Sequence, residues 1–290
     1  MKKMFVVLVI LILVQMTSTA QEFIEICRGA NQSPDIILIR SGAGSGFDRV
    51  STIEPGEEVN YLTETQDAQG QVWGKVVDQS GTEGYVASWL ITKTDCLSVE
   101  VLPTSGENCQ TIFKYQNLMF EAEGLLKYSG FLSINQIVDI ANLVDSYFPN
   151  GTYTDKQILI YFIPTMEEYQ RVFSGWGENT LGAYGSVQLD DCHLVPYENG
   201  INWNIVAVLY DQSIIGTLVH ELAHSMGAEH GPFGTIQGGL DPSIPREMDA
   251  FYWERLVVVS LVQGCDMLTT YSLEEEMDRV LCPQIREIFE

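Results

Sequence analysis

Three of the chain's four histidines fall between positions 220 and 230, in the segment VHELAHSMGAEH. His220 and His224 stand four residues apart, and Glu221 directly follows the first, which gives the spacing H-E-x-x-H. On a helix of 3.6 residues per turn, positions four apart lie nearly above one another, so both imidazoles can reach one metal ion. Glu221 is then a candidate general base beside the metal. The spacing predicts a zinc site that activates water for hydrolysis of a peptide or related amide.

The residues around this motif predict a helix that follows a buried strand. Asp211 or Ser213 could cap the helix, and apolar side chains then recur at helical spacing. These apolar positions are Ile214, Ile215, Leu218, Leu222 and Met226. The preceding run Asn204–Tyr210 (NIVAVLY) is typical of a buried strand. We therefore expect a strand, then a helix that presents both histidines on one face.

A zinc site of this kind needs a third protein ligand, and the sequence offers two candidates. His230 completes the longer spacing H-E-x-x-H-x-x-G-x-x-H, in which Gly227 could break the helix and let the chain swing back. This spacing resembles the metzincin metallopeptidases, and Met248 would stand at their Met-turn. Glu247, in PREMDAFYWERL, resembles the glutamate on the second helix of gluzincin metallopeptidases, with Ala250 three positions later.

We favour Glu247 as the third ligand and keep His230 as the alternative. The order of strands and helices before the motif resembles the gluzincins, and Met248 lies in a segment, Arg246–Val262, whose apolar positions predict a helix rather than a tight turn. Phe251 departs from the thermolysin pattern, which has an aspartate at that place. Both resemblances imply a zinc cofactor and Glu221 as the base.

Other side chains are candidates by residue type only. A donor to the transition-state oxyanion besides zinc could come from Tyr252, Arg246, Tyr184 or Tyr271. For Tyr252 we expect a packed helix aromatic instead. We expect His193 to be a loop or surface residue rather than a remote ligand, and the adjacent Asp190 and Asp191 are weak candidates for calcium.

Ahead of this region, positions 36–91 contain short apolar runs broken by glycine and polar turns, which predict a small all-β barrel. The predicted strands are Ile36–Ile39, Glu58–Leu62, Val72–Val77 and Gly84–Val86. The order of IRSG, the Pro-Gly turn at 55–56, VWGKV and GYVASWL resembles bacterial SH3-like domains. That resemblance implies a module that binds cell-wall peptides or docks the protein. The alternative is a compact spacer with Trp73, Tyr85 and Trp89 in its core.

We predict a multi-domain chain, with a small all-β SH3-like barrel followed by an α+β zincin-like metallopeptidase domain. Residues 1–20 are a predicted signal peptide, 21–96 the barrel, 97–108 a linker and 109–290 the catalytic domain. Further predicted elements of the catalytic domain are helices at Ile134–Phe148 (capped by Ser133), Thr165–Phe173 and Leu273–Phe289 (interrupted near Pro283), and strands at Ile158–Ile163 and Leu181–Leu189.

The leader, the charge and the cysteines indicate an extracytoplasmic protein. The apolar run Phe5–Val14 is too short to span a membrane comfortably, so we expect cleavage of the leader, with a retained N-terminal anchor as the alternative. A net charge of −24 argues against nucleic acid as a partner. Six cysteines in a secreted chain suggest disulfides. The simplest pairing is Cys27 with Cys96, Cys265 with Cys282 and Cys109 with Cys192, although the spacing alone allows others.

The leading hypothesis is a secreted zinc metallopeptidase that acts on a peptide or protein substrate, including cell-wall peptide brought by the SH3-like module. One alternative is a cell-wall or surface-binding protein with that targeting module and an inactive zinc domain. Another is that the module occludes the catalytic cleft until the linker is cut. Neither the substrate nor the oligomeric state follows from the sequence, because specificity pockets are built from loops and strand edges.

Overall fold

The computed structural model describes residues 22–102, 111–129, 132–148, 158–172, 182–190, 193–196, 203–209, 214–230, 244–271 and 276–289. The predicted signal peptide, Cys109, Cys192 and positions 103–108 of the predicted linker lie outside these residues. One sheet of 13 strands runs through the described chain in the order β12-β11-β13-β10-β9-β8-β7-β1-β4-β5-β6-β2-β3. The barrel and the second domain are therefore joined by continuous strand pairing.

The barrel contains short antiparallel strands, four of which lie where the sequence predicted strands, whereas the strand at residues 49–53 was not predicted. They are β2 (Ile37–Arg40), β3 (Arg49–Ile53), β4 (Glu58–Gln66), β5 (Val72–Val77) and β6 (Glu83–Ala87), followed by the turn η1 (Ser88–Leu90). Their inward side chains, with Ile39, Ile53, Val59, Val76 and Val86 fully buried, form a core separate from that of the second domain. Trp73 is buried, Tyr85 is half-buried and Trp89 is exposed, so only one of the three aromatics belongs to the interior.

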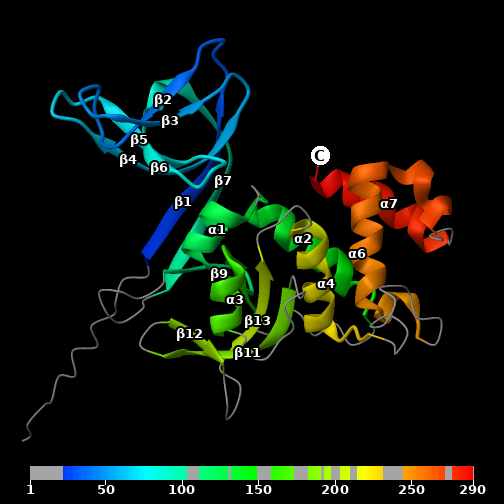
Figure 1. Cartoon of the computed structure of the whole chain (residues 1–290). Helices are drawn as coiled ribbons and strands as arrows, with labels where there is room; N and C mark the ends of the chain where they lie inside the picture. Colours follow the sequence, from blue (N-terminus) through cyan, green and yellow to red (C-terminus); the bar gives the residue numbers. More distant parts are fainter. Residues whose placement is uncertain are drawn as a thin grey trace, which may run out of the picture.

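Two long strands, β1 (Glu22–Asn31) and β7 (Ile91–Leu102), pass from the barrel into the second domain (Figure 1). Ile26 and Val99 belong to the core of the second domain, whereas Cys27 and Ile91 belong to the core of the barrel. The prediction of a linker from position 97 was wrong for residues 97–102. Those residues pair with β1 on one side and β8 on the other, which gives their backbone groups the partners that a linker would find in water.

The second domain continues the sheet. It contributes β8 (Ile112–Tyr115), β9 (Leu118–Glu121), β10 (Ile158–Ile163), β11 (Gly182–Asp190), β12 (His193–Pro196) and β13 (Trp203–Leu209). β10 lies parallel to β9 and β13, and all six of its residues are buried. A parallel strand with cover on both faces reads as a continuous apolar run, which is why ILIYFI was recognisable as a strand. β11 runs antiparallel to β13 and carries β12 on its other side.

Helices cover this sheet and complete the core. They are α1 (Ala122–Tyr128), α2 (Ile134–Asp145), α3 (Met166–Val172), α4 (Ile214–Met226), α6 (Ala250–Val258) and α7 (Glu276–Phe289). α1 and α3 pack against β10, α4 packs against β13 and β11, and α6 packs against α4 (Figure 1). Ser133 caps α2 through a capping box with Gln136, as its position before the apolar stripe predicted.

Two helix predictions need correction. Arg246–Val262 is not one helix: Arg246–Met248 form the 3-10 turn η3, Asp249 caps α6 by accepting from the Phe251 N–H, and η4 (Val259–Gln263) follows as a π-helix before η5 (Cys265–Tyr271). The cap explains the break, because an N-cap aspartate has extended backbone angles. α7 continues through Pro283 without the expected interruption.

The barrel also contacts the second domain through α1. The amide of Asn60 donates to the Leu126 carbonyl at 3.0 Å, and Lys127 pairs with Glu83 at 3.5 Å. The predicted disulfides Cys27–Cys96 and Cys265–Cys282 are both present; the first joins β1 to β7 near a register shift in their pairing. These contacts hold the barrel beside β1 and β7. The motif helix α4 instead comes directly after β13, from which β10, β9 and β8 separate β7 in the sheet. Occlusion of a cleft at α4 by the barrel therefore finds no support in this arrangement.

The disulfides fit an oxidising compartment, which agrees with the extracytoplasmic location expected from the sequence. Among the helices of the described residues, none has the length and apolar character needed to cross a membrane.

Candidate metal centre

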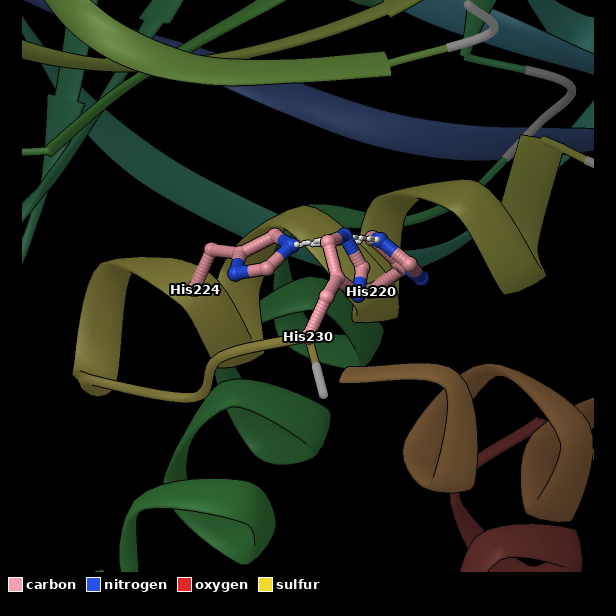
Figure 2. A group of neighbouring side chains, drawn as sticks. All are labelled: His220, His224 and His230. Atoms are coloured by element: carbon pink, nitrogen blue, oxygen red, sulfur yellow. Dashed lines mark hydrogen bonds between the residues drawn. The ribbon is translucent and has the colours of Figure 1, made fainter. Parts of the chain in front are cut away.

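The imidazoles of His220, His224 and His230 converge on one point (Figure 2). The Nε2 atom of His224 lies 3.2 Å from that of His220 and 3.0 Å from that of His230, and the third Nε2–Nε2 distance is 3.3 Å. His220 and His224 come from consecutive turns of α4, as the spacing predicted. His230 comes from the segment that leaves the end of that helix.

Gly227 allows the chain to turn back toward the helix. Its φ is +110°, which a residue with a Cβ rarely adopts. The Gly227 N–H donates to the carbonyl of His224 at 3.1 Å and the Ala228 N–H to that of Ala223 at 2.9 Å, which is the pattern of a Schellman motif. This helix end satisfies the last carbonyls and directs residues 228–230 back along the face that carries the two histidines.

A short backbone pairing then fixes the returning segment. Glu229 forms a parallel bridge with Asp249: its N–H donates to the Met248 carbonyl at 2.9 Å, and its carbonyl accepts from the Ala250 N–H at 3.3 Å. Because the N-terminus of α6 is anchored to this segment, His230 is held from both directions, by the end of α4 and by the start of α6.

The Nδ1 atoms of the three histidines have different surroundings. That of His220 lies 2.8 Å from Oε2 of Glu254, and that of His224 lies 2.8 Å from the Ala228 carbonyl oxygen. Both oxygens can only accept, so Nδ1 carries the proton in each ring and the lone pair of Nε2 faces the common point. Nδ1 of His230 is buried and has no hydrogen-bond partner among the residues that the structure describes.

The surroundings also keep two of these rings neutral. Burial lowers the pKa of His224 to about 4, with a smaller contribution from His220 in the same direction. Burial again lowers the pKa of His230 to about 4, and the neighbouring His224 and His220 add to this effect. Both rings are therefore unprotonated at neutral pH, which is the state that a metal ligand requires.

The donor set fits a tetrahedral zinc ion. With Zn–N bonds of about 2.0–2.1 Å, two nitrogens of a tetrahedral site lie roughly 3.3 Å apart, and the observed separations are 3.0 to 3.3 Å. Lone pairs that face one another at this distance repel unless a cation lies between them. Three imidazoles also leave a fourth position for water or substrate, as catalytic zinc sites do.

The geometry places His230, and not Glu247, beside His220 and His224, which favours His230 as the third member of the group. Glu247 lies in η3 and does not belong to the convergent group. Its backbone carbonyl accepts from Trp253 Nε1 at 2.9 Å, which ties η3 to α6. The preference for Glu247 assumed a continuous helix from Arg246, and the cap at Asp249 removes that premise. Met248 is half-buried against the domain core, in a turn rather than in a helix.

Glu221 lies on α4, where it is buried with only 6% of its surface exposed. Its side chain lies beside Gly182, the first residue of β11, where an added Cβ would lie 2.7 Å from Oε1 of Glu221. The carbonyl of Gly182 accepts from the hydroxyl of the fully buried Tyr169 on α3 at 2.9 Å. Burial, and after it the Glu221 carboxylate, raise the pKa of Tyr169. The candidate base thus lies between the motif helix and the start of β11.

Two of the suggested oxyanion donors have structural partners. The hydroxyl of the fully buried Tyr252 donates to Asp278 at 2.6 Å, and Arg246 pairs with the same carboxylate at 3.3 Å. Both residues thereby tie α7 to η3 and α6, as expected for Tyr252. Tyr184 lies in β11 and Tyr271 ends η5. His193 lies in β12, not in a loop, and pairs with Asp190; Asp191 is outside the described residues.

Sequence reasoning missed two residues of α6 that contact the histidines. Glu254 bonds to His220, and the ring of Phe251 lies 4.8 Å from that of His220 and 4.6 Å from that of His230 between centroids. The segment PREMDAFYWERL was recognised as part of the site, but with Glu247 as its contributor. The helix cap at Asp249 was the available signal, because it excludes position 247 from the helix that carries Phe251 and Glu254.

Comparison with known proteins identifies the barrel only. Residues 39–92 match the family model described as the bacterial SH3 domain, which confirms the SH3-like interpretation of that region. No curated protein and no solved structure matches the chain. For the second domain, the motif and the geometry around it carry the interpretation.

Proposed function

We propose that the second domain is a zinc-dependent metallopeptidase, with His220, His224 and His230 as ligands and Glu221 as general base. The convergence of three Nε2 atoms within 3.3 Å of one another carries the proposal. A buried carboxylate directly after the first of these histidines supports it. The expected leader and the disulfides favour action outside the cytoplasm.

Each protein group has a distinct task in the proposed reaction. Zinc, when bound, would lower the pKa of a water molecule towards 7 and polarise the scissile carbonyl. The neutral rings of His224 and His230 supply nitrogen lone pairs without first losing a proton. Glu221 accepts a proton from the attacking water and passes it to the leaving amine. Gly182 leaves room beside this carboxylate, because any side chain there would displace it.

The test is metal analysis of the purified protein together with the variant Glu221→Gln. We expect about one zinc per chain in both proteins, and a loss of peptide hydrolysis in the variant of about 10²- to 10⁴-fold, the usual contribution of a general base. Hydrolysis is measured on a library of quenched fluorescent peptides that includes cell-wall stem peptides. A Glu221→Gln protein with full activity would overturn the mechanism, and a wild-type protein without zinc would overturn the metal site.

The barrel supports a second, accessory function. Trp89 is 60% exposed and Phe47 is 50% exposed, although both are large apolar side chains. Trp89 rests edge-on against the buried Trp73, with 6.3 Å between ring centroids, so it is held at the surface on a fixed support. Exposed aromatic side chains on a rigid module favour ligand binding, and bacterial SH3 domains commonly bind cell-wall or protein partners. Docking to cell-wall peptide would bring substrate to the second domain.

A sedimentation assay with purified cell-wall material separates the two functions. We expect the wild-type protein to bind, Trp89→Ala to bind more weakly, and Glu221→Gln to bind like the wild type. Binding without any peptide hydrolysis by the zinc-loaded wild type would favour the alternative, a wall-binding protein with an inactive zinc domain.

A further inference from the structure

We propose that Glu254 is the positioning residue for His220: it fixes which nitrogen of that ring carries the proton and holds the ring in its orientation. The inference rests on the proposed zinc site, since it concerns how that site is held. Glu254 is a side-chain carboxylate that bonds to one of the three convergent histidines, His220. The sequence motif contains no such residue, because Glu254 lies 34 positions after His220.

The contact has the properties of a strong orienting hydrogen bond. The Nδ1 atom of His220 lies 2.8 Å from Oε2 of Glu254, within the range of charge-assisted bonds. The histidine side chain is 10% exposed and that of the glutamate 34%, so solvent competes little at the imidazole end. A carboxylate on the outer nitrogen fixes the tautomer, orients the ring and makes the inner nitrogen a better donor to a metal.

Glycine at position 216 provides the space that this contact needs. Gly216 lies on α4 one turn before His220, where α4 meets α6. An added Cβ there would lie 2.8 Å from Cγ2 of Val258 and 3.4 Å from Cγ of Glu254. A larger residue would push α6 away from α4 and carry the Glu254 carboxylate with it. Close approach of the two helices is therefore a condition for the bond to His220.

Phe251 shows that the same face of α6 contacts two of the three histidines. It precedes Glu254 by three positions, so the two side chains lie on one face of the helix. Its ring packs against His220 at 4.8 Å and His230 at 4.6 Å. α6 thus contributes an apolar support and a carboxylate, while Glu247 lies ahead of the helix cap, where its backbone carbonyl accepts from Trp253.

The test compares the zinc affinity of the full chain with that of four variants, by competition with a chromophoric chelator. We expect Glu254→Ala to bind Zn²⁺ about 10- to 100-fold more weakly, the usual effect of losing such an outer partner. Glu254→Gln should lose less, because its amide oxygen can still accept from Nδ1. Gly216→Ala should reproduce part of the loss. Glu247→Gln is the matched control, a carboxylate-to-amide change in the neighbouring turn, and should bind like the wild type.

Two further measurements distinguish positioning from a general structural role. The absorption spectrum of the Co²⁺-loaded protein should shift in Glu254→Ala and Glu254→Gln but not in Glu247→Gln. The Tm of the metal-free protein should change little in Glu254→Gln, which keeps the shape of the side chain. If Glu254→Ala fails to fold, Glu254→Gln carries the test through its affinity and its Co²⁺ spectrum.

The outcomes separate this inference from the proposed function. If the wild type binds no Zn²⁺, or binds it equally well after His220→Ala, the proposed metal site fails. If His220→Ala abolishes binding while the Glu254 variants keep wild-type affinity and the wild-type Co²⁺ spectrum, only the positioning role fails. Equal losses in Glu254→Gln and Glu247→Gln would also overturn it, because they would reflect charge near the site rather than a specific contact.

Discussion

The histidine centre and the SH3-like barrel place their candidate functional side chains in opposite environments. At the centre, polar groups are buried: His220 and Glu221 are 8% and 6% exposed, and contacts from α4, α6 and β11 surround them. On the barrel, apolar groups are exposed, with Trp89 at 60%. Burying a polar group is costly unless it has a partner, so each buried group constrains its neighbours. We therefore expect substitutions to have sharp effects at the centre and graded ones on the barrel.

The largest effect should come from the third ligand. His230→Ala should reduce zinc affinity by more than about 100-fold, since two imidazoles alone leave a catalytic zinc site without its third ligand. Glu247→Gln, which changes the competing candidate, should leave the affinity unchanged. Metal content after dialysis against a chelator measures both. The reverse result, with loss in Glu247→Gln and none in His230→Ala, would restore the glutamate as ligand.

The next largest effect concerns the paired strands β1 and β7, which join the barrel to the second domain. Replacing Cys27 and Cys96 together by serine should lower the free energy of unfolding by about 2–4 kcal/mol, because the disulfide closes a long loop of the unfolded chain. Thermal unfolding measures the loss, and zinc affinity at a temperature where the variant is folded should match the wild type. A parallel loss of zinc affinity in the folded variant would show that the two regions are coupled more closely than their separate cores indicate.

A pH dependence is expected where the second domain supports the barrel. Glu121 caps α1, and burial raises its pKa to about 7, whereas its ordinary value is 4.5. The folded state therefore binds the proton more tightly than the unfolded state. Protonated Glu121 therefore adds roughly 3 kcal/mol to the free energy of unfolding, at about 1.4 kcal/mol per pH unit of pKa shift. This stabilisation is fully present below the pKa of the unfolded state and is lost as the pH rises through 7.

The variant Glu121→Gln tests this expectation, because the amide cannot titrate and keeps one of the two oxygens that accept from the Glu123 and Gly124 N–H groups. Between about pH 5 and pH 8, the Tm of the wild type should fall relative to that of the variant. Equal slopes for the two proteins would contradict it. The neighbouring Glu123 and Lys127, which have smaller opposing effects on the pKa of Glu121, remain in both proteins.

The smallest effect on folding should come from the exposed aromatic of the barrel. Trp89→Ala removes a side chain that is mostly in solvent and one edge-on contact with Trp73, so the free energy of unfolding should fall by only about 1 kcal/mol. Chemical denaturation measures this change. Zinc affinity should be unaffected. A loss as large as that of the Cys27–Cys96 variant would mean that Trp89 is structural, and the two regions would then differ less than their exposures indicate.

The sequence by itself determined the local features of this protein. Runs such as Val72–Val77 and Ile158–Ile163 have the short length and apolar composition of the strands that they form, and Ser133 has the position of the cap that it provides. The spacing of His220 and His224 predicted that they share one face of the helix, because residues four positions apart do so in any α-helix, whatever surrounds it. The pairing of Cys27 with Cys96 was the simplest of the pairings that the sequence allowed, and the structure contains it.

Only the tertiary structure brought His230, and not Glu247, beside the other two histidines and supplied Glu254 as the partner of His220. These outcomes depend on where α6 begins, which the local cap at Asp249 sets, and on how closely α6 approaches α4. That approach depends on contacts distant in sequence, between Gly216 and the side chains of Val258 and Glu254. The same holds for β1 and β7, whose pairing across both domains turned part of a predicted linker into a strand. A local sequence pattern specifies a helix or a strand, but the packing of these elements determines which of their side chains contact one another.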